Sequence, residues 1–259
     1  MISRIQQIAE DGLILKVLVG SGVHGTAIEG SDDTDHMGIC FEPPECVIGL
    51  ERFEQYEHRT AWERGRNARS QAGDLDLVVY GLRKWLRLAL AGNPTILLPM
   101  FTPSEHVIYE DRFGKALRDE VPEMVASREA GRRFLGYMQA QRAKMLGLRS
   151  THTNRPELIE AYGYDCKFAM HMVRLGLQGV EYLRTGRITL PVPQPDRDRL
   201  RLIRMGQVTK DEIIVWAEEL EAELSGLLLT SPLPDRPDTA RANAWLVSMY
   251  MAAWSDSDE

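Results

Sequence analysis

The sequence predicts an α+β protein, with a mixed sheet and flanking helices over residues 1–120 and a helical domain over 121–259. Two observations predict this division. Before residue 120, short apolar runs rich in Val, Leu and Ile alternate with turns, which is typical of buried strands. After residue 120, long stretches with apolar residues at helical spacing are separated by Pro-rich breaks, which is typical of packed helices.

The first half is expected to alternate helices, strands and turns. LILKVLVG (13–20) has the length and the composition of a buried strand, and GLRKWLRLALAGNP (81–94) repeats its apolar residues at helical spacing before Gly92 and Pro94. The expected elements are a helix at 3–11, a strand at 13–20, a turn and short helix at 21–30, a strand at 36–43, a loop or hairpin insertion at 51–73, a strand at 74–80 and a helix at 81–94.

The second half is expected to hold four helices. They are separated by breaks such as PVPQPD (191–196) and SPLPDRPD (231–238), in which proline cannot continue a helix. The expected helices cover residues 126–149, 157–185, 211–229 and 239–254.

Composition excludes several classes of protein. The chain has 259 residues, of which 44% are hydrophobic and 27% charged, and this composition excludes a disordered chain. The net charge of −7 excludes indiscriminate coating of nucleic acid, so any such contact must use a local basic patch. The sequence has no run of 18 apolar residues, so it predicts no membrane span. The N-terminus does not resemble a signal peptide. Cys40, Cys46 and Cys166 form no CxxC pair, so we expect free thiols in a reducing, cytoplasmic setting.

The stretch GSGVHGTAIEGSDDTD (20–35) combines two features of phosphate chemistry. Asp33 and Asp35 lie two residues apart at a strand, so their carboxylates point to the same face and could bind one or two Mg²⁺ ions. Two such ions about 4 Å apart can activate an attacking oxygen and stabilise a leaving pyrophosphate. Gly20 would let the backbone approach phosphate closely, and Ser21 offers a hydroxyl and an amide.

The neighbouring acids divide into a turn residue and a third candidate ligand. Asp32 is out of phase with Asp33 and Asp35, so we expect it to cap the turn or face solvent. A third acid is expected on a neighbouring strand, where Asp74 and Asp76 are both available. Asp76 is preferred because it is closer to the apolar body of its strand. The alternative is that both are ordinary polar residues at the start of a strand.

These motifs resemble the Gly-Ser…Asp-x-Asp signature of the DNA polymerase β nucleotidyltransferase superfamily, and most closely the RNA repair pathway DNA polymerase beta family. The resemblance covers most of the chain except 51–73 and the tail. It implies a polymerase-β-like nucleotidyltransferase core followed by a helical domain, a nucleoside triphosphate as substrate, and Mg²⁺ or Mn²⁺. By position, Asp33 and Asp35 match the metal-binding pair, and Asp76 is the best match for the third acid. The phosphate loop is matched by Gly20 and Ser21.

A second set of candidates lies in YGYDCKFAMHMVRL (162–175). Tyr164, Lys167, His171 and Arg174 follow one another at spacings of three and four residues, which puts them on one face of a helix. Such a face suits an aromatic base and a polyphosphate, so these residues are predicted to bind the nucleotide. The alternative is a solvated basic face with a histidine in the core.

A basic helix precedes that face. Between residues 126 and 156 there are seven Lys or Arg and one acid, Glu129, which gives this segment a net charge of +6 in a protein of net −7. We expect its arginine stripe to receive the phosphates of an acceptor such as RNA. The alternative is that the arginines pair with acids such as Glu157 and Glu160. The arginines of this stripe are Arg128, Arg132, Arg142 and Arg149.

The expected function is therefore a Mg²⁺-dependent nucleotidyltransferase with a two-metal mechanism. It would transfer a nucleoside monophosphate from a triphosphate to a hydroxyl group, with an RNA end as the first candidate acceptor. Two alternatives stay open: a relative that modifies a protein, and a non-catalytic relative that binds nucleotide or protein in the manner of an antitoxin. The sequence predicts no membrane partner.

Overall fold

The computed structural model describes residues 2–28, 30, 32–148 and 155–256. The chain divides into two compact units, a sheet unit and a helical unit. The sheet unit comprises Met1–Ala91, Thr95–Val125 and Asp238–Glu259, and the helical unit comprises Gly92–Pro94 and Ala126–Pro237. The division at residue 120 that the sequence suggested stays a prediction, and the last helix groups with the sheet rather than with the other C-terminal helices.

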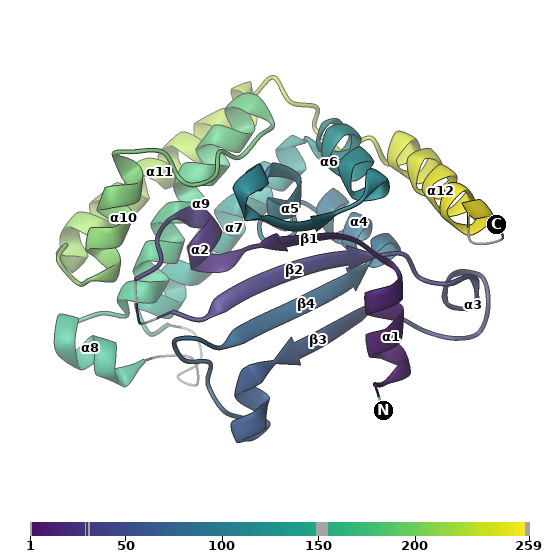
Figure 1. Cartoon of the computed structure of the whole chain (residues 1–259). Helices are drawn as coiled ribbons and strands as arrows, with labels where there is room; N and C mark the ends of the chain where they lie inside the picture. The colour runs from purple at the N-terminus through teal and green to yellow at the C-terminus, as the bar shows by residue number, and fades with distance from the viewer. Residues whose placement is uncertain (1, 29, 31, 149–154, 257–259) are drawn as a thin grey trace. The chain divides into compact units, whose positions relative to one another are not determined.

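The sheet has five strands in the order β3-β4-β2-β1-β5 (Figure 1). Strands β2 and β4 are parallel and the other neighbouring pairs are antiparallel, so the sheet is mixed and the predicted fold class is confirmed. Its inner face is built from apolar side chains such as Leu15, Val17 and Ile39, none of which is exposed. The strands are β1 (Leu13–Leu18), β2 (Thr34–Cys40), β3 (Gln55–Arg59), β4 (Leu75–Gly81) and β5 (Val107–Glu110).

Helices and short turns complete the sheet unit. Trp85 of α4 is fully buried, and its indole nitrogen donates to the Ile96 carbonyl at 3.1 Å. The last helix, α12, is fixed to the end of β2, because the Tyr250 hydroxyl donates to the buried Glu42 carboxylate and the Trp254 indole donates to the Glu42 carbonyl at 3.4 Å. The helices are α1 (Arg4–Asp11), α2 (Gly20–His24), α3 (Pro44–Val47), α4 (Leu82–Leu90), α5 (Leu98–Phe101), α6 (Arg112–Val125) and α12 (Thr239–Asp256), with 3₁₀ turns η1 (Thr60–Arg64) and η2 (Ser104–His106).

The helical unit packs around α9. Close packing requires small residues there: a Cβ on Gly131 of α7 would lie 2.3 Å from Leu183 of α9. Helix α11 begins with a capping box between Thr209 and Glu212, which satisfies its first amides. The helices are α7 (Arg128–Met145), α8 (Pro156–Tyr162), α9 (Cys166–Thr185), α10 (Asp196–Arg204) and α11 (Lys210–Thr230).

Several elements differ from the sequence-based expectation. The predicted helix at 157–185 is two helices, because Gly163 adopts φ +79° and ends α8, while the Asp165 carboxylate caps α9. Helices α6 and α10 and strand β5 were not predicted. The segment 51–73, by contrast, was predicted as a loop or hairpin insertion, and it does form one arm of a hairpin: it contains β3, which pairs antiparallel with β4, and η1.

Two negative expectations can be compared with the structure. The three cysteines are free thiols, as predicted, and the structure places all three in buried positions. Among the described residues, none of the helices combines the length and the apolar character that crossing a membrane would require.

Candidate functional site

Three carboxylates come together where β2 and β4 begin. Asp33 directly precedes β2, and Asp35 and Asp76 are the second residues of β2 and β4. The parallel register pairs Asp35 with Asp76, so these two side chains leave the sheet on the same face. One oxygen from each of the three carboxylates lies within 4.8 Å of the others. The structure thus brings together the three acids that the sequence singled out.

The electrostatics of this acid cluster (Asp33, Asp35 and Asp76) favour a cation. Burial, followed by the charges of Asp33 and Asp76, raises the pKa of Asp35 to about 6. No described residue donates a hydrogen bond to the side chains of Asp33 or Asp35. A divalent cation with hard oxygen ligands would offset the repulsion, so the donor set fits Mg²⁺ or Mn²⁺.

Gly20 determines how closely α2 approaches these acids. Its φ is +65°, and a Cβ at this position would lie 1.9 Å from an Asp35 carboxylate oxygen. The Val19 amide also donates to the Asp35 carbonyl at 2.8 Å. The sequence predicted that this glycine allows a close approach to phosphate, whereas the approach in the structure is to Asp35. Any side chain here would displace that carboxylate.

Ser21 and Asp32 close the loop between β1 and β2. The Asp32 carboxylate accepts from the Ser21 hydroxyl at 3.3 Å and from the Ile28 amide at 2.9 Å. Asp32 therefore caps this turn, and the prediction that it is a turn residue is confirmed. The long bond to Asp32 holds the Ser21 hydroxyl only loosely, so phosphate binding by Ser21 stays a prediction.

Asp74 and Asp76 differ sharply although they are two residues apart. The Asp74 side chain is 8% exposed and accepts bonds from the guanidinium of Arg64, the Thr60 hydroxyl at 2.9 Å and the Gln71 amide at 2.7 Å. Above all the Arg64 guanidinium, then the Gln71 amide, hold the pKa of Asp74 well below its ordinary value. These partners of Asp74 all belong to the segment that precedes β4, which indicates a structural role.

Asp76 has weaker partners, which the sequence did not reveal. The Ser70 hydroxyl donates to one of its oxygens at 2.8 Å, and Arg59 Nε lies 3.5 Å from the other. Both partners come from segment 51–73, where the sequence has no apolar pattern that would fix a register. Asp76 is thus oriented by two contacts, with 15% of its side chain exposed.

The predicted nucleotide-binding residues on α9 have different surroundings. Tyr164 is 3% exposed, and its hydroxyl donates to the Val208 carbonyl at 2.6 Å, which favours a structural role in the helical unit. Burial lowers the pKa of His171 to about 3, so this imidazole is neutral. The Arg174 guanidinium donates to Gln178 at 2.8 Å, and Lys167 is half-buried one turn before His171.

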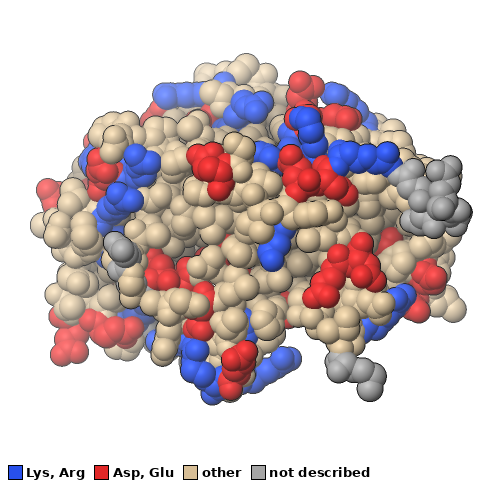
Figure 2. Space-filling view, in the orientation of Figure 1, with Lys and Arg blue, Asp and Glu red and all other residues tan. Residues whose placement is uncertain are grey.

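The arginines of α7 are largely neutralised by acids of the helical unit. This observation favours the alternative of internal ion pairs, which Arg128, Arg132 and Arg142 form with Asp235, Glu218 and Glu221. On the face in view, Figure 2 shows basic and acidic side chains interspersed over the surface of the molecule. Arg149 lies outside the described residues, and the acceptor role stays a prediction. The pairs are Arg128–Asp235 (3.8 Å), Arg132–Asp235 (2.6 Å), Arg142–Glu218 (2.6 Å) and Arg142–Glu221 (3.4 Å).

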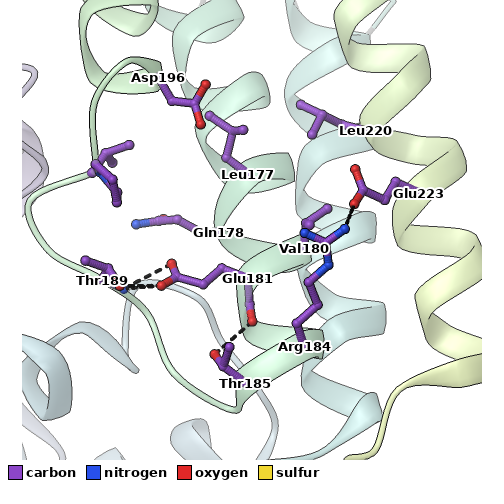
Figure 3. A pocket seen from close by; sticks show the side chains of 12 residues that line it. Leu177, Gln178, Val180, Glu181, Arg184, Thr185, Thr189, Asp196, Leu220 and Glu223 are labelled. Atoms are coloured by element: carbon purple, nitrogen blue, oxygen red, sulfur yellow. Dashed lines mark hydrogen bonds and ion pairs between the residues drawn. The ribbon is translucent and has the colours of Figure 1, made fainter.

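The helical unit also has an open hollow of about 470 Å³ beside the C-terminal half of α9 (Figure 3). Its charged side chains include two that are already paired: Glu181 accepts from the Thr189 amide at 3.0 Å, and Arg184 pairs with Glu223. None of the predicted site residues lines it. This hollow therefore gives no indication of a ligand.

The match to a family model supports a transferase. The model of the RNA repair pathway DNA polymerase beta family matches residues 1–248. No curated protein matches the chain. Among solved structures, a nucleotidyltransferase-like protein from Exiguobacterium sibiricum is similar over 87% of this chain and 71% of that chain, with 13% identity and a TM-score of 0.30.

Proposed function

The chain belongs to the RNA repair pathway DNA polymerase beta family, and from this membership and the acid cluster we propose that it is a Mg²⁺-dependent nucleotidyltransferase. It would transfer a nucleoside monophosphate from a triphosphate to a hydroxyl group. The convergence of Asp33, Asp35 and Asp76 is the single observation that carries the proposal, because this chemistry requires hard oxygen ligands for divalent cations at one place.

Each residue at the acid cluster has a role in the proposed reaction. Held by Asp33, Asp35 and Asp76, divalent cations would neutralise the triphosphate and make the attacking hydroxyl more acidic. Asp76 would accept the proton of that hydroxyl. Gly20 keeps the backbone of α2 close to Asp35 without a side chain between them, and the hydroxyl and amide of Ser21 would bind phosphate oxygens.

The helical unit would contribute positive charge. Lys167 and Arg174, on one face of α9, would neutralise the leaving pyrophosphate. The neutral His171 lies between them in sequence and would serve as a hydrogen-bonding group rather than as a cation. Tyr164 is not needed for this role, since its hydroxyl is engaged within the unit.

The preferred acceptor is an RNA end. Membership of an RNA repair family supports this choice, whereas the arginines of α7 do not, because binding RNA there would require their ion pairs with acids to be broken. A protein side chain as acceptor is the second candidate, since transfer to a hydroxyl group would use the same acid cluster.

One assay separates these functions. The protein is incubated with each labelled triphosphate, Mg²⁺, and either total RNA or cell lysate, and Asp35→Asn serves as the matched inactive control. Label on RNA that is absent with the variant supports the proposal. Label on protein supports the second acceptor, and tight nucleotide binding without transfer would indicate a non-catalytic relative.

A further inference from the structure

A single basic side chain faces the acid cluster from the outer strand of the sheet. Arg59 is the last residue of β3, and the register pairs it with Asp76, which in turn pairs with Asp35. These three residues form a row across three strands and point to the same face of the sheet. Arg59 is thus placed opposite the acids by backbone pairing and not by a flexible loop.

The segment after β3 is fastened so that this row is maintained. The Thr60 hydroxyl accepts from the Leu75 amide at 2.9 Å and donates to Asp74, which also binds Arg64. Further along the same segment, the Ser70 hydroxyl donates a hydrogen bond to Asp76. Asp74 therefore anchors the segment from which both partners of Asp76 come.

The contact between Arg59 and Asp76 is weak and can be broken at little cost. It uses only Nε, at 3.5 Å, and 46% of the Arg59 side chain is exposed. No described residue accepts a hydrogen bond from that side chain. Its other contact is with the Trp62 ring, whose centroid lies 6.0 Å from the guanidinium carbon, at the long end of the range for such contacts. An ion pair of this length and exposure adds little stability. The positive charge of Arg59 nevertheless acts on Asp35 as well, in opposition to Asp33 and Asp76.

A divalent cation at the same carboxylates would repel the guanidinium of Arg59 and would replace it as the positive charge that neutralises Asp76. Arg59 would then be a mobile cation beside a bound triphosphate, and guanidinium groups bind phosphate through paired hydrogen bonds. We propose that Arg59 is the internal counterion of Asp76 in the metal-free protein and becomes a ligand of a substrate phosphate once a divalent cation replaces it. This inference rests on the proposed function.

The test compares Arg59→Gln with Arg66→Gln, which removes the same charge from the same segment. Arg66 is exposed, lies over the Trp62 ring at 4.8 Å from its centroid, and forms no ion pair with an acid among the described residues. Mn²⁺ affinity is measured without nucleotide by electron paramagnetic resonance. The affinity for a non-hydrolysable triphosphate analogue is then measured by calorimetry at saturating Mn²⁺.

Opposite changes are expected in R59Q. Mn²⁺ should bind about three- to tenfold more tightly, because a competing positive charge is gone, and the analogue about tenfold more weakly. R66Q should match the wild type in both measurements. If R59Q does not fold, R59K serves instead: it keeps the charge but not the fork of donors, so Mn²⁺ affinity should stay near the wild-type value while analogue affinity falls.

A purely structural role for Arg59 gives a different result. Mn²⁺ affinity in R59Q would then be unchanged or weaker, or R66Q would show the same shift, and either outcome overturns the inference. Wild-type protein and Asp35→Asn are titrated in parallel. If they bind Mn²⁺ equally, the proposed function fails together with this inference, whereas a metal site that is intact but insensitive to Arg59 overturns the inference alone.

Discussion

The acid cluster of the sheet unit and the arginine stripe of α7 are both concentrations of like charge, but they differ in how closely opposite charges approach them. The arginines find acids on α11 and before α12, at distances down to 2.6 Å. At the acid cluster, Arg59 is 3.5 Å from Asp76 and burial raises the pKa of Asp35 to about 6. Charge that is neutralised internally stabilises a fold, whereas charge left in excess at a half-buried site is available for a ligand.

The largest expected effect comes from removing a carboxylate of the cluster. Asp35→Asn should reduce label transfer by about a thousandfold or more, because a metal ligand is lost. The same change should raise the free energy of unfolding of the metal-free protein at pH 7 by about 1–2 kcal/mol, because repulsion and desolvation of the charge disappear. Label transfer and urea denaturation measure the two effects. Loss of activity together with loss of stability would show that Asp35 is structural.

Replacing Asp76 of β4 and Asp74, which directly precedes β4, one at a time sharpens the comparison. Asp76→Asn should reduce label transfer by about a hundredfold or more, because a metal ligand is lost. Its melting temperature should change little, because the contacts of Asp76 with Ser70 and Arg59 are weak. Asp74→Asn should instead lower the melting temperature, since the Arg64, Thr60 and Gln71 bonds all depend on that carboxylate. Thermal denaturation and transfer assays on both variants test this. The reverse assignment would identify Asp74 as the third acid.

Lower pH should weaken metal binding through Asp35. With a pKa of about 6, this carboxylate takes up a proton as pH falls through 6, and Mn²⁺ affinity should then fall by up to about tenfold per pH unit. The stability effect has the opposite sign. Because the folded pKa lies above the ordinary value of 3.8, Asp35 favours the folded, metal-free protein increasingly as pH falls from 6 towards 4. Mn²⁺ titrations from pH 5 to 8 would contradict this if affinity stayed constant.

Metal should stabilise the wild type but not the variant without Asp35. At about one hundred times its Kd, a bound ion adds about 2.7 kcal/mol to the free energy of unfolding. Melting curves with and without Mg²⁺ measure this shift, and KCl at the same ionic strength is the control for nonspecific salt effects. Equal shifts in wild type and Asp35→Asn would place the ion elsewhere.

The smallest effect is expected at α7. Arg142→Gln breaks pairs with Glu218 and Glu221, which lie within the helical unit, so transfer should change by less than about threefold while stability falls slightly. If label transfer to RNA fell by more than about tenfold, the result would support the prediction that this arginine stripe binds the acceptor. The assay uses RNA at concentrations below saturation, where weaker binding is visible.

The sequence predicted the core of the acid cluster because it depends on local spacing. Asp33 and Asp35 are two residues apart at the start of an apolar strand, and Asp76 occupies the matching position of β4. The preference for Asp76 over Asp74 used its closeness to the apolar part of the strand and its positional match to the third acid of the family that the sequence resembles. The structure adds that Asp74 is fully engaged by Arg64, Thr60 and Gln71.

The partners of the acids could not be predicted, because they depend on tertiary pairing. Strand β3 reads QYEHR, an outer strand without an apolar run, and its register with β4 is what brings Arg59 to Asp76. Helix α12 belongs to the sheet unit, where it packs against α6 and α4 and where Tyr250 bonds to Glu42, 208 residues away in sequence. Periodicity identifies such a helix but not the surface on which it packs.

Anomalous diffraction from crystals soaked with Mn²⁺ and a non-hydrolysable triphosphate tests the central claim most directly. We predict Mn²⁺ coordinated jointly by Asp33, Asp35 and Asp76, with the phosphates of the analogue on the same ions. An anomalous map with no Mn²⁺ at these three carboxylates, while the analogue is bound elsewhere, would contradict the account.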